Sequence, residues 1–163
     1  ISYHSFKMQK LDSFLKKSNE LYGQYRFANA ATLRFERLMK EVYGKDFLSI
    51  SEKEMRKGIK SKTTKKFNVV NKLKAAYKAL KLSMKSAKDI AVKAKGLISE
   101  SSGLIQDSIK RIKNNPTKAA FVPKVLVDTK NVIVRLKDVM VGTPVVVKRL
   151  ATYTKVMNLL AGI

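Results

Sequence analysis

The sequence predicts an all-α protein with a single domain over residues 1–163, built as an antiparallel bundle of about five or six amphipathic helices, one of them long and basic. Apolar residues recur at three-and-four spacing in most segments, which is typical of helices that bury one face. The 163-residue chain is 45% hydrophobic, which is enough for a core. It has no Cys, so a small disulfide-stapled scaffold is excluded.

The charge of the chain is strongly unbalanced. Lys and Arg number 35 against 12 Asp and Glu, which gives a formal net charge of +23. Such a charge exceeds what solubility requires and opposes folding through self-repulsion. The composition therefore predicts an anionic partner, and it leaves nucleic acid, an anionic lipid surface and an acidic glycoprotein open.

Two helices of ordinary length are expected before residue 45. The first has its apolar stripe at Leu11, Phe14, Leu15, Leu21, Tyr22 and Tyr25, and the second has Ala31, Phe35, Leu38, Met39 and Val42. Gly44 would end the second helix, because a left-handed residue commonly follows a helix C-terminus.

A long basic helix is expected to begin at Ser51-Glu52-Lys53-Glu54, which has the pattern of a capping box. Its apolar repeat runs from Met55 to Ile98 and ends among Gly96 and residues 99–103. The hydroxyl-rich segment 61–64 lowers helix propensity, so a kink is expected there. A short fourth helix over 104–112 would stop before Asn114-Asn115-Pro116.

The segment 125–140 is ambiguous, because its many β-branched residues would also suit strands. One helical face nevertheless aligns Val125, Thr129, Val132, Leu136 and Met140, and a lone hairpin in a helical chain would be marginal. This alignment favours a helix. Thr143-Pro144 would then cap and start a last helix.

Residues that could support catalysis are scarce. His4 is the sole histidine and lies near the start of the chain, so neither a triad nor a His-based metal site is expected. Glu52 and Glu54 suit helix capping, and the segment 58–64 lacks the order of a phosphate-binding loop. The sequence therefore predicts a protein that is not an enzyme, with no catalytic residue, metal or cofactor.

Five lysines at spacings of four and three residues lie on one stripe of the expected long helix: Lys74, Lys78, Lys81, Lys85 and Lys88. Like charges three or four residues apart disfavour a helix, so the stripe is predicted to bind an anionic surface. The alternative is a solvated face of a lysine-rich chain. Basic residues nearer the helix start extend the charge. The complete predicted surface is Arg56, Lys57, Lys60, Lys74, Lys78, Lys81, Lys85 and Lys88.

The preference for Lys over Arg favours general attraction to a surface over base readout, because Arg supplies the planar fork for bidentate recognition. A membrane would first attract the lysines, and partial opening of the bundle would then let apolar stripes enter the interface. Ordinary core packing is the alternative role of the apolar residues in the last helix. The candidates for insertion are Val145, Val146, Val147, Met157, Leu159 and Leu160.

The order of features in the first 70 residues resembles mature gastropod sperm lysin. These features are Ser2-Tyr3-His4, a first amphipathic helix, a second helix closed by Gly44-Lys45, and Leu48-Ser49 before a basic helix. The resemblance implies a secreted acrosomal protein of fertilization with a helical bundle and no catalytic site. It agrees with the start at Ile1, which would suit a processed mature form.

Members of the lysin family divide between two roles. Lysin opens the egg vitelline envelope by stoichiometric binding of a receptor glycoprotein, whereas a fusagenic paralogue acts on membranes. The absence of Trp and the excess of Lys over Arg favour the paralogue. We therefore expect binding and fusion of anionic membranes, with the envelope-dissolving lysin and a nucleic-acid-binding protein as alternatives, and with monomer and homodimer both open.

Overall fold

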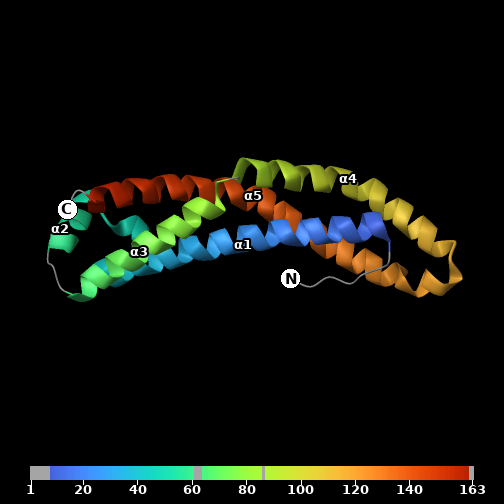
Figure 1. Cartoon of the computed structure of the whole chain (residues 1–163), viewed down its shortest axis with the longest axis horizontal. Coiled ribbons are helices and arrows are strands. Elements are labelled where there is room, and N and C mark those ends of the chain that lie inside the picture. The colour runs from blue at the N-terminus through green and yellow to red at the C-terminus, as the bar shows by residue number, and fades with distance from the viewer. Residues whose placement is uncertain (1–7, 61–63, 86, 162–163) are drawn as a thin grey trace. The chain divides into compact units, whose positions relative to one another are not determined.

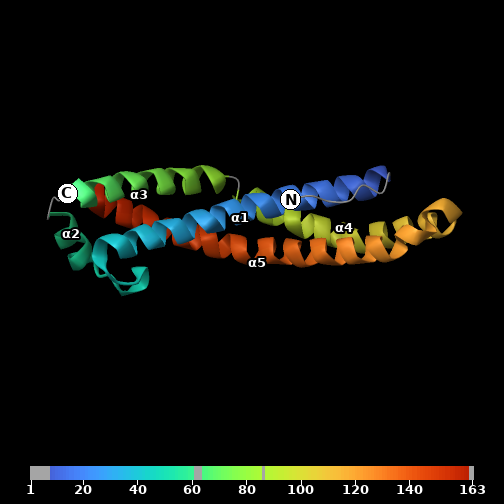
Figure 2. The same ribbon diagram turned by 90° about the horizontal axis from the view of Figure 1, so that it is seen from below.

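The computed structural model describes residues 8–60, 64–85 and 87–161, and this part of the chain is all-α, as predicted. His4 and the rest of the segment Ser2-Tyr3-His4 lie outside the described residues. Figure 1 shows the helices and Figure 2 gives a second view. The elements are α1 (Gln9–Tyr43), η1 (Phe47–Ser49), α2 (Glu52–Lys60), α3 (Thr64–Ser83), α4 (Ala87–Lys113), η2 (Pro116–Phe121) and α5 (Val122–Ala161).

The chain forms two compact units that share its two longest helices. In the described residues, unit 1 comprises 8–25 and 87–144, and unit 2 comprises 26–60, 64–85 and 145–161. Both α1 and α5 therefore contribute one part to each unit. The prediction of a single domain stays a prediction.

Unit 1 consists of the first part of α1, α4, η2 and the first part of α5, with α4 running opposite to the other two helices (Figures 1 and 2). Arg135 of α5 donates to the Asn19 side chain at 3.0 Å, and its guanidinium lies 5.6 Å from the Tyr22 ring centroid. Gly142 lets α5 pass close to α1, because a Cβ at this position would overlap the Tyr25 side chain. These contacts join α1 to α5 within unit 1.

Unit 2 has an aromatic cluster in its core. Phe35 of α1 stacks on Tyr153 of α5 with ring centroids 4.3 Å apart, and Phe47 of η1 meets both rings edge-on. The Tyr153 hydroxyl donates to Glu36 Oε1 at 2.7 Å. Burial is the largest cause, and this hydrogen bond the next, of a raised Tyr153 pKa. The cluster therefore keeps a neutral phenol in its centre.

Tyrosine hydroxyls also join α3 and α2 to the long helices of unit 2. The hydroxyls of Tyr77 in α3 and Thr154 in α5 lie 3.0 Å apart. Tyr43, at the end of α1, donates to the carbonyl of Met55 in α2 at 2.6 Å, and burial raises the pKa of Tyr43 to about 12. Both tyrosines are half-buried, and each hydroxyl has a polar partner, as is usual for a buried phenol.

The prediction of two helices before residue 45 is wrong, because α1 is one helix of 35 residues. Ala28 and Thr32 are fully buried and carry the buried stripe of the first part into that of the second. Burial of this continuous stripe outweighs the low helix propensity of Gly23 and Asn29. The predicted end is confirmed, since Gly44 follows α1 with a φ of +70°.

The long basic helix is also divided differently from the prediction. Ser51 caps α2 as expected, with its Oγ accepting from the Glu54 amide at 3.2 Å. Further along, α3 ends at Ser83 and a new helix, α4, begins at Ala87. α4 then continues through Gly96 and the 99–103 cluster, which was expected to end a helix. Buried Ala94, Leu97, Ser101, Ser108 and Ile112 keep α4 on one face across this cluster.

The segment 125–140 is helical, which confirms the favoured interpretation, and α5 continues through Pro144 instead of starting anew there. Buried residues on both sides of the proline, Val139, Thr143 and Val146, hold one face together. Val139 lies on this buried face in the place expected for Met140, which is exposed. Proline inside a helix costs about 3 kcal/mol, so packing must offset that loss.

Candidate functional site

A continuous run of 34 residues, 55–88, carries positive charge with no acidic residue. It lies between Glu54 and Asp89 and contains twelve Lys and Arg residues. The sequence interpretation named a stripe of lysines in this region but missed the absence of acids, which counting alone reveals. We call this run the acid-free segment.

Within the acid-free segment, Lys74, Lys78 and Lys81 form the exposed face of α3. They lie opposite Val69, Leu73, Ala76 and Leu80, which are buried in unit 2. None of the ion pairs among the described residues involves these three lysines. The central part of the predicted stripe is therefore a row of exposed ammonium groups.

The rest of the predicted stripe does not lie on α3. Lys85 follows the end of α3 and is exposed, and Lys88 belongs to α4 in unit 1. The expectation that one helix carries the whole stripe, Lys74, Lys78, Lys81, Lys85 and Lys88, is thus wrong. A continuous helix would have placed Lys81, Lys85 and Lys88 within two turns, where like charges repel.

The basic residues before the stripe lie on a different helix from the one predicted. Arg56 and Lys57 are exposed on α2, which is separate from α3. Lys60 is the last residue of α2, and the side chains of Lys60, Lys88 and Leu160 lie outside the described part of the structure. The acid-free segment therefore spans more than one helix.

The residues predicted to insert into a membrane have different environments on α5. Val145 and Val147 are exposed, whereas Val146 is buried in the core of unit 2. Met157 and Leu159 are half-buried. Val146 therefore has the alternative role that the sequence left open, core packing. In the part of the chain that the structure describes, no helix is long and apolar enough to cross a bilayer.

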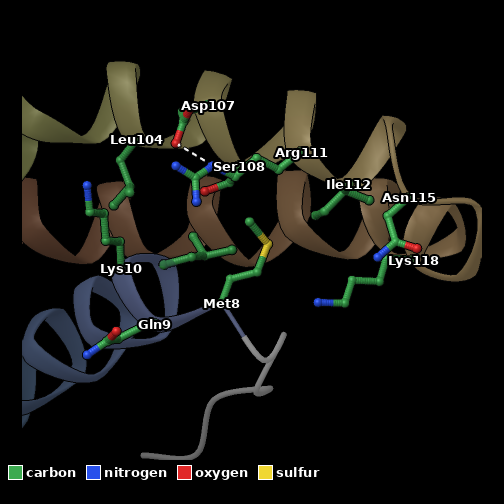
Figure 3. Close-up of a pocket in the computed structure, with 11 residues that line it drawn as sticks. Met8, Gln9, Lys10, Leu104, Asp107, Ser108, Arg111, Ile112, Asn115 and Lys118 are labelled. Atoms are coloured by element: carbon green, nitrogen blue, oxygen red, sulfur yellow. Dashed lines mark ion pairs between the residues drawn. The ribbon is translucent and has the colours of Figure 1, made fainter.

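A cavity of about 370 Å³ lies in unit 1 between the start of α1 and the second half of α4 (Figure 3). Met8, Leu11 and Leu104 supply apolar walls, and Lys10, Arg111 and Lys118 supply cations. Asp107 is the sole carboxylate in the lining and is paired with Arg111 at 3.2 Å. This lining brings together no nucleophile with an adjacent base.

Groups that could hold a metal are equally sparse. Over residues 8–60, 64–85 and 87–161, no three His, Cys, Asp or Glu side chains gather closely enough to bind an ion. No protein-family model, curated protein or solved structure matches the chain.

Proposed function

We propose that the protein binds anionic membranes through its lysine-rich helix faces and perturbs them, without catalysing a reaction. The acid-free segment is the observation that carries this proposal. On α3, Lys74, Lys78 and Lys81 of this segment are exposed, while the opposite face of the same helix is buried in unit 2. Each basic residue close to an anionic leaflet contributes about 1 kcal/mol of attraction.

Membranes are favoured over other polyanions because apolar side chains accompany the lysines. Leu82 follows Lys81 on α3 and is 65% exposed. An apolar side chain beside cations gains free energy in the interface of a bilayer, but gains little on a hydrated glycan or a phosphate backbone. The alternative partners are an acidic egg-envelope glycoprotein and nucleic acid, and the experiments below distinguish them from a membrane.

The direct test measures binding to vesicles of phosphatidylcholine with and without 30% phosphatidylserine, at low salt, by flotation and by release of a trapped dye. We expect binding and dye release with the anionic vesicles alone. Equal inactivity on both compositions would contradict the proposal. Tight binding to DNA or heparin that persists at physiological salt, without vesicle binding, would favour the alternatives.

A triple variant, K74Q/K78Q/K81Q, tests the site itself. With about 1 kcal/mol for each lysine, vesicle affinity should fall by about a hundredfold. The matched control, K40Q/K45Q/K124Q, removes the same formal charge from lysines that are each paired with a carboxylate. This control should lose less than about tenfold, because it alters the long-range field but not the contact face. Equal losses in both variants would show that the α3 face has no special role.

We further propose, from the resemblance of the first 70 residues to sperm lysin, that the protein acts in fertilization as a secreted protein of the acrosomal vesicle. Antibody staining of sperm before and after the acrosome reaction tests this setting. Isolated egg envelopes test the lysin alternative, which predicts loosening at stoichiometric amounts of protein without cleavage products.

A further inference from the structure

The solvent face of α5 in unit 1 alternates valines with lysines. Val127, Val134 and Val141 recur every seven residues and are 54%, 53% and 68% exposed. Lys130 and Lys137 lie between them and are also exposed. Seven residues are close to two helical turns, so all five side chains lie on one stripe. We call this stripe the valine–lysine face.

The valine–lysine face lies opposite the residues that α5 buries in unit 1. That buried stripe comprises Val125, Thr129, Val132, Leu136 and Val139, each at most 3% exposed. The fold of unit 1 therefore does not need apolar residues on the outer side of α5. The acidic residues nearby are Asp138, exposed beside Lys137, and Asp128, which accepts from Lys124 at 3.0 Å.

Valine at an exposed helix position lowers the stability of the helix and contributes nothing to the core of the unit. Its branched Cβ restricts the side chain and lowers helix propensity relative to Ala, Leu or Lys. Its exposed surface gains nothing from the core, and single exposed apolar residues are common on proteins. A row of exposed valines at regular spacing, with lysines between them, instead indicates a surface that contacts a binding partner.

The lysines of this face indicate what kind of partner binds to it. A second copy of the chain packed on the same face would bring Lys130 and Lys137 against their own counterparts, where like charges oppose association. An anionic bilayer has the opposite charge. Lysine stems can also lie along the apolar region while the ammonium groups reach the headgroups, which suits lysines placed between valines.

We propose that the valine–lysine face of α5 lies in the interface of an anionic bilayer, with the helix parallel to the membrane plane and unit 1 still folded. This inference rests on the proposed membrane function and names the surface that makes apolar contact. From Val127 to Val141 the face is about 21 Å long. Because the valines are already exposed, this contact needs no opening of the bundle.

A tryptophan reporter tests the contact in the full-length chain, which has no Trp of its own. We expect V134W to show a blue-shifted emission with anionic vesicles, and quenching by lipids brominated on the acyl chains. The matched reporter is V92W, at a 63% exposed valine of α4, which should shift little. Unchanged circular dichroism on binding would show that the helices stay folded.

A variant of the face and a matched control measure the apolar contribution. V134T/V141T keeps side-chain shape and should weaken vesicle binding by about tenfold, because two apolar contacts are lost. V92T makes the same chemical change at an exposed valine of α4, outside the face, and should change binding by less than about twofold.

The outcomes separate this inference from the proposed function. A parent chain that binds no vesicles contradicts both. A parent chain that binds anionic vesicles while V134W stays unquenched and V134T/V141T binds normally overturns the inference alone. A blue shift of V134W that rises with protein concentration without lipid, or appears only with an acidic protein, would likewise overturn it, since the face would then have a protein partner.

Discussion

Unit 1 and unit 2 each take one part of α1 and one part of α5, yet they differ in what fills the core and in how charge is placed outside. Unit 2 is organised around the stacked rings of Phe35 and Tyr153 with Phe47 at their edge. Unit 1 instead buries Phe14 among aliphatic side chains and small hydroxyl residues such as Ser101, Ser108 and Thr129. The same pair of helices therefore supports two kinds of core. Unit 2 has an anchored core, built around stacked aromatic rings, and unit 1 has a distributed core, made mainly of aliphatic side chains along its helices.

The outer surfaces of the two units differ in a related way. In unit 2, α3 presents Lys74, Lys78 and Lys81 without ion pairs among the described residues. In unit 1, α5 begins with a Lys124–Asp128 pair and then presents valines between its lysines. This contrast suggests two contributions to membrane binding, long-range attraction from α3 and apolar contact from α5.

The largest effect is expected from breaking the aromatic anchor of unit 2. Tyr153→Ala removes a fully buried ring that stacks on Phe35, so the free energy of unfolding should fall by about 3–5 kcal/mol. Val139→Ala, at a fully buried site of unit 1, should cost only about 2 kcal/mol. Urea denaturation followed by circular dichroism measures both. Equal losses would remove the distinction between an anchored and a distributed core.

The sequence predicted the helical class because the buried faces have clear periodicity. In α5, Val125, Thr129, Val132 and Leu136 recur at four, three and four residues, and this spacing outweighed the β-branched composition. The cap at Ser51 and the end at Gly44 were predictable because each depends on local chemistry that one or two residues specify.

The helix break after α3 could not be predicted from periodicity. Buried Leu80, Met84, Ala87 and Ile90 keep helical spacing across it, so the pattern gives no sign of an interruption. At this point the backbone amide of Lys85 donates to the carbonyl of Leu82 at 3.3 Å, three residues back instead of the four of an α-helix. The continuity of α5 at Pro144 was missed for the opposite reason, because a strong local signal was overridden by packing.

The candidate site was only partly predictable for a similar reason. Lys74, Lys78 and Lys81 lie on one face of α3, as predicted, because their spacing alone places them on the same face of a helix. The valine–lysine face was missed because apolar residues at helical spacing are normally assigned to the core. Val125 and Val127 lie two positions apart, and only the tertiary structure shows which of them faces outward.

The next effect is expected from alkaline pH and concerns unit 2. Burial raises the pKa of Tyr43 to about 12, above the ordinary value near 10 that it has when unfolded. The stabilisation from its neutral phenol is complete below pH 10 and is lost as the pH rises from 10 towards 12. Stability should therefore fall over this window, as measured by urea denaturation with phenolate absorbance.

Tyr43→Phe isolates the phenol, because every other side chain is unchanged. This variant should be less stable than the parent at pH 8, where it lacks the hydrogen bond to the Met55 carbonyl, and the difference should narrow towards pH 12. A difference that stays constant across the window would mean that Tyr43 titrates normally.

The smallest effect sharpens the contrast in surface charge and has opposite signs in the two units. In unit 2, Lys78→Gln removes repulsion with Lys74 at i−4 and Lys81 at i+3, so stability should rise by about 0.5 kcal/mol. In unit 1, Lys124→Gln removes an i,i+4 attraction to Asp128 and should lower stability by about 0.3–0.5 kcal/mol. Thermal unfolding at 20 mM salt measures both, and 0.5 M salt should shrink both shifts. Shifts of the same sign would mean that the whole-chain charge, and not the local arrangement of each unit, governs its electrostatic stability.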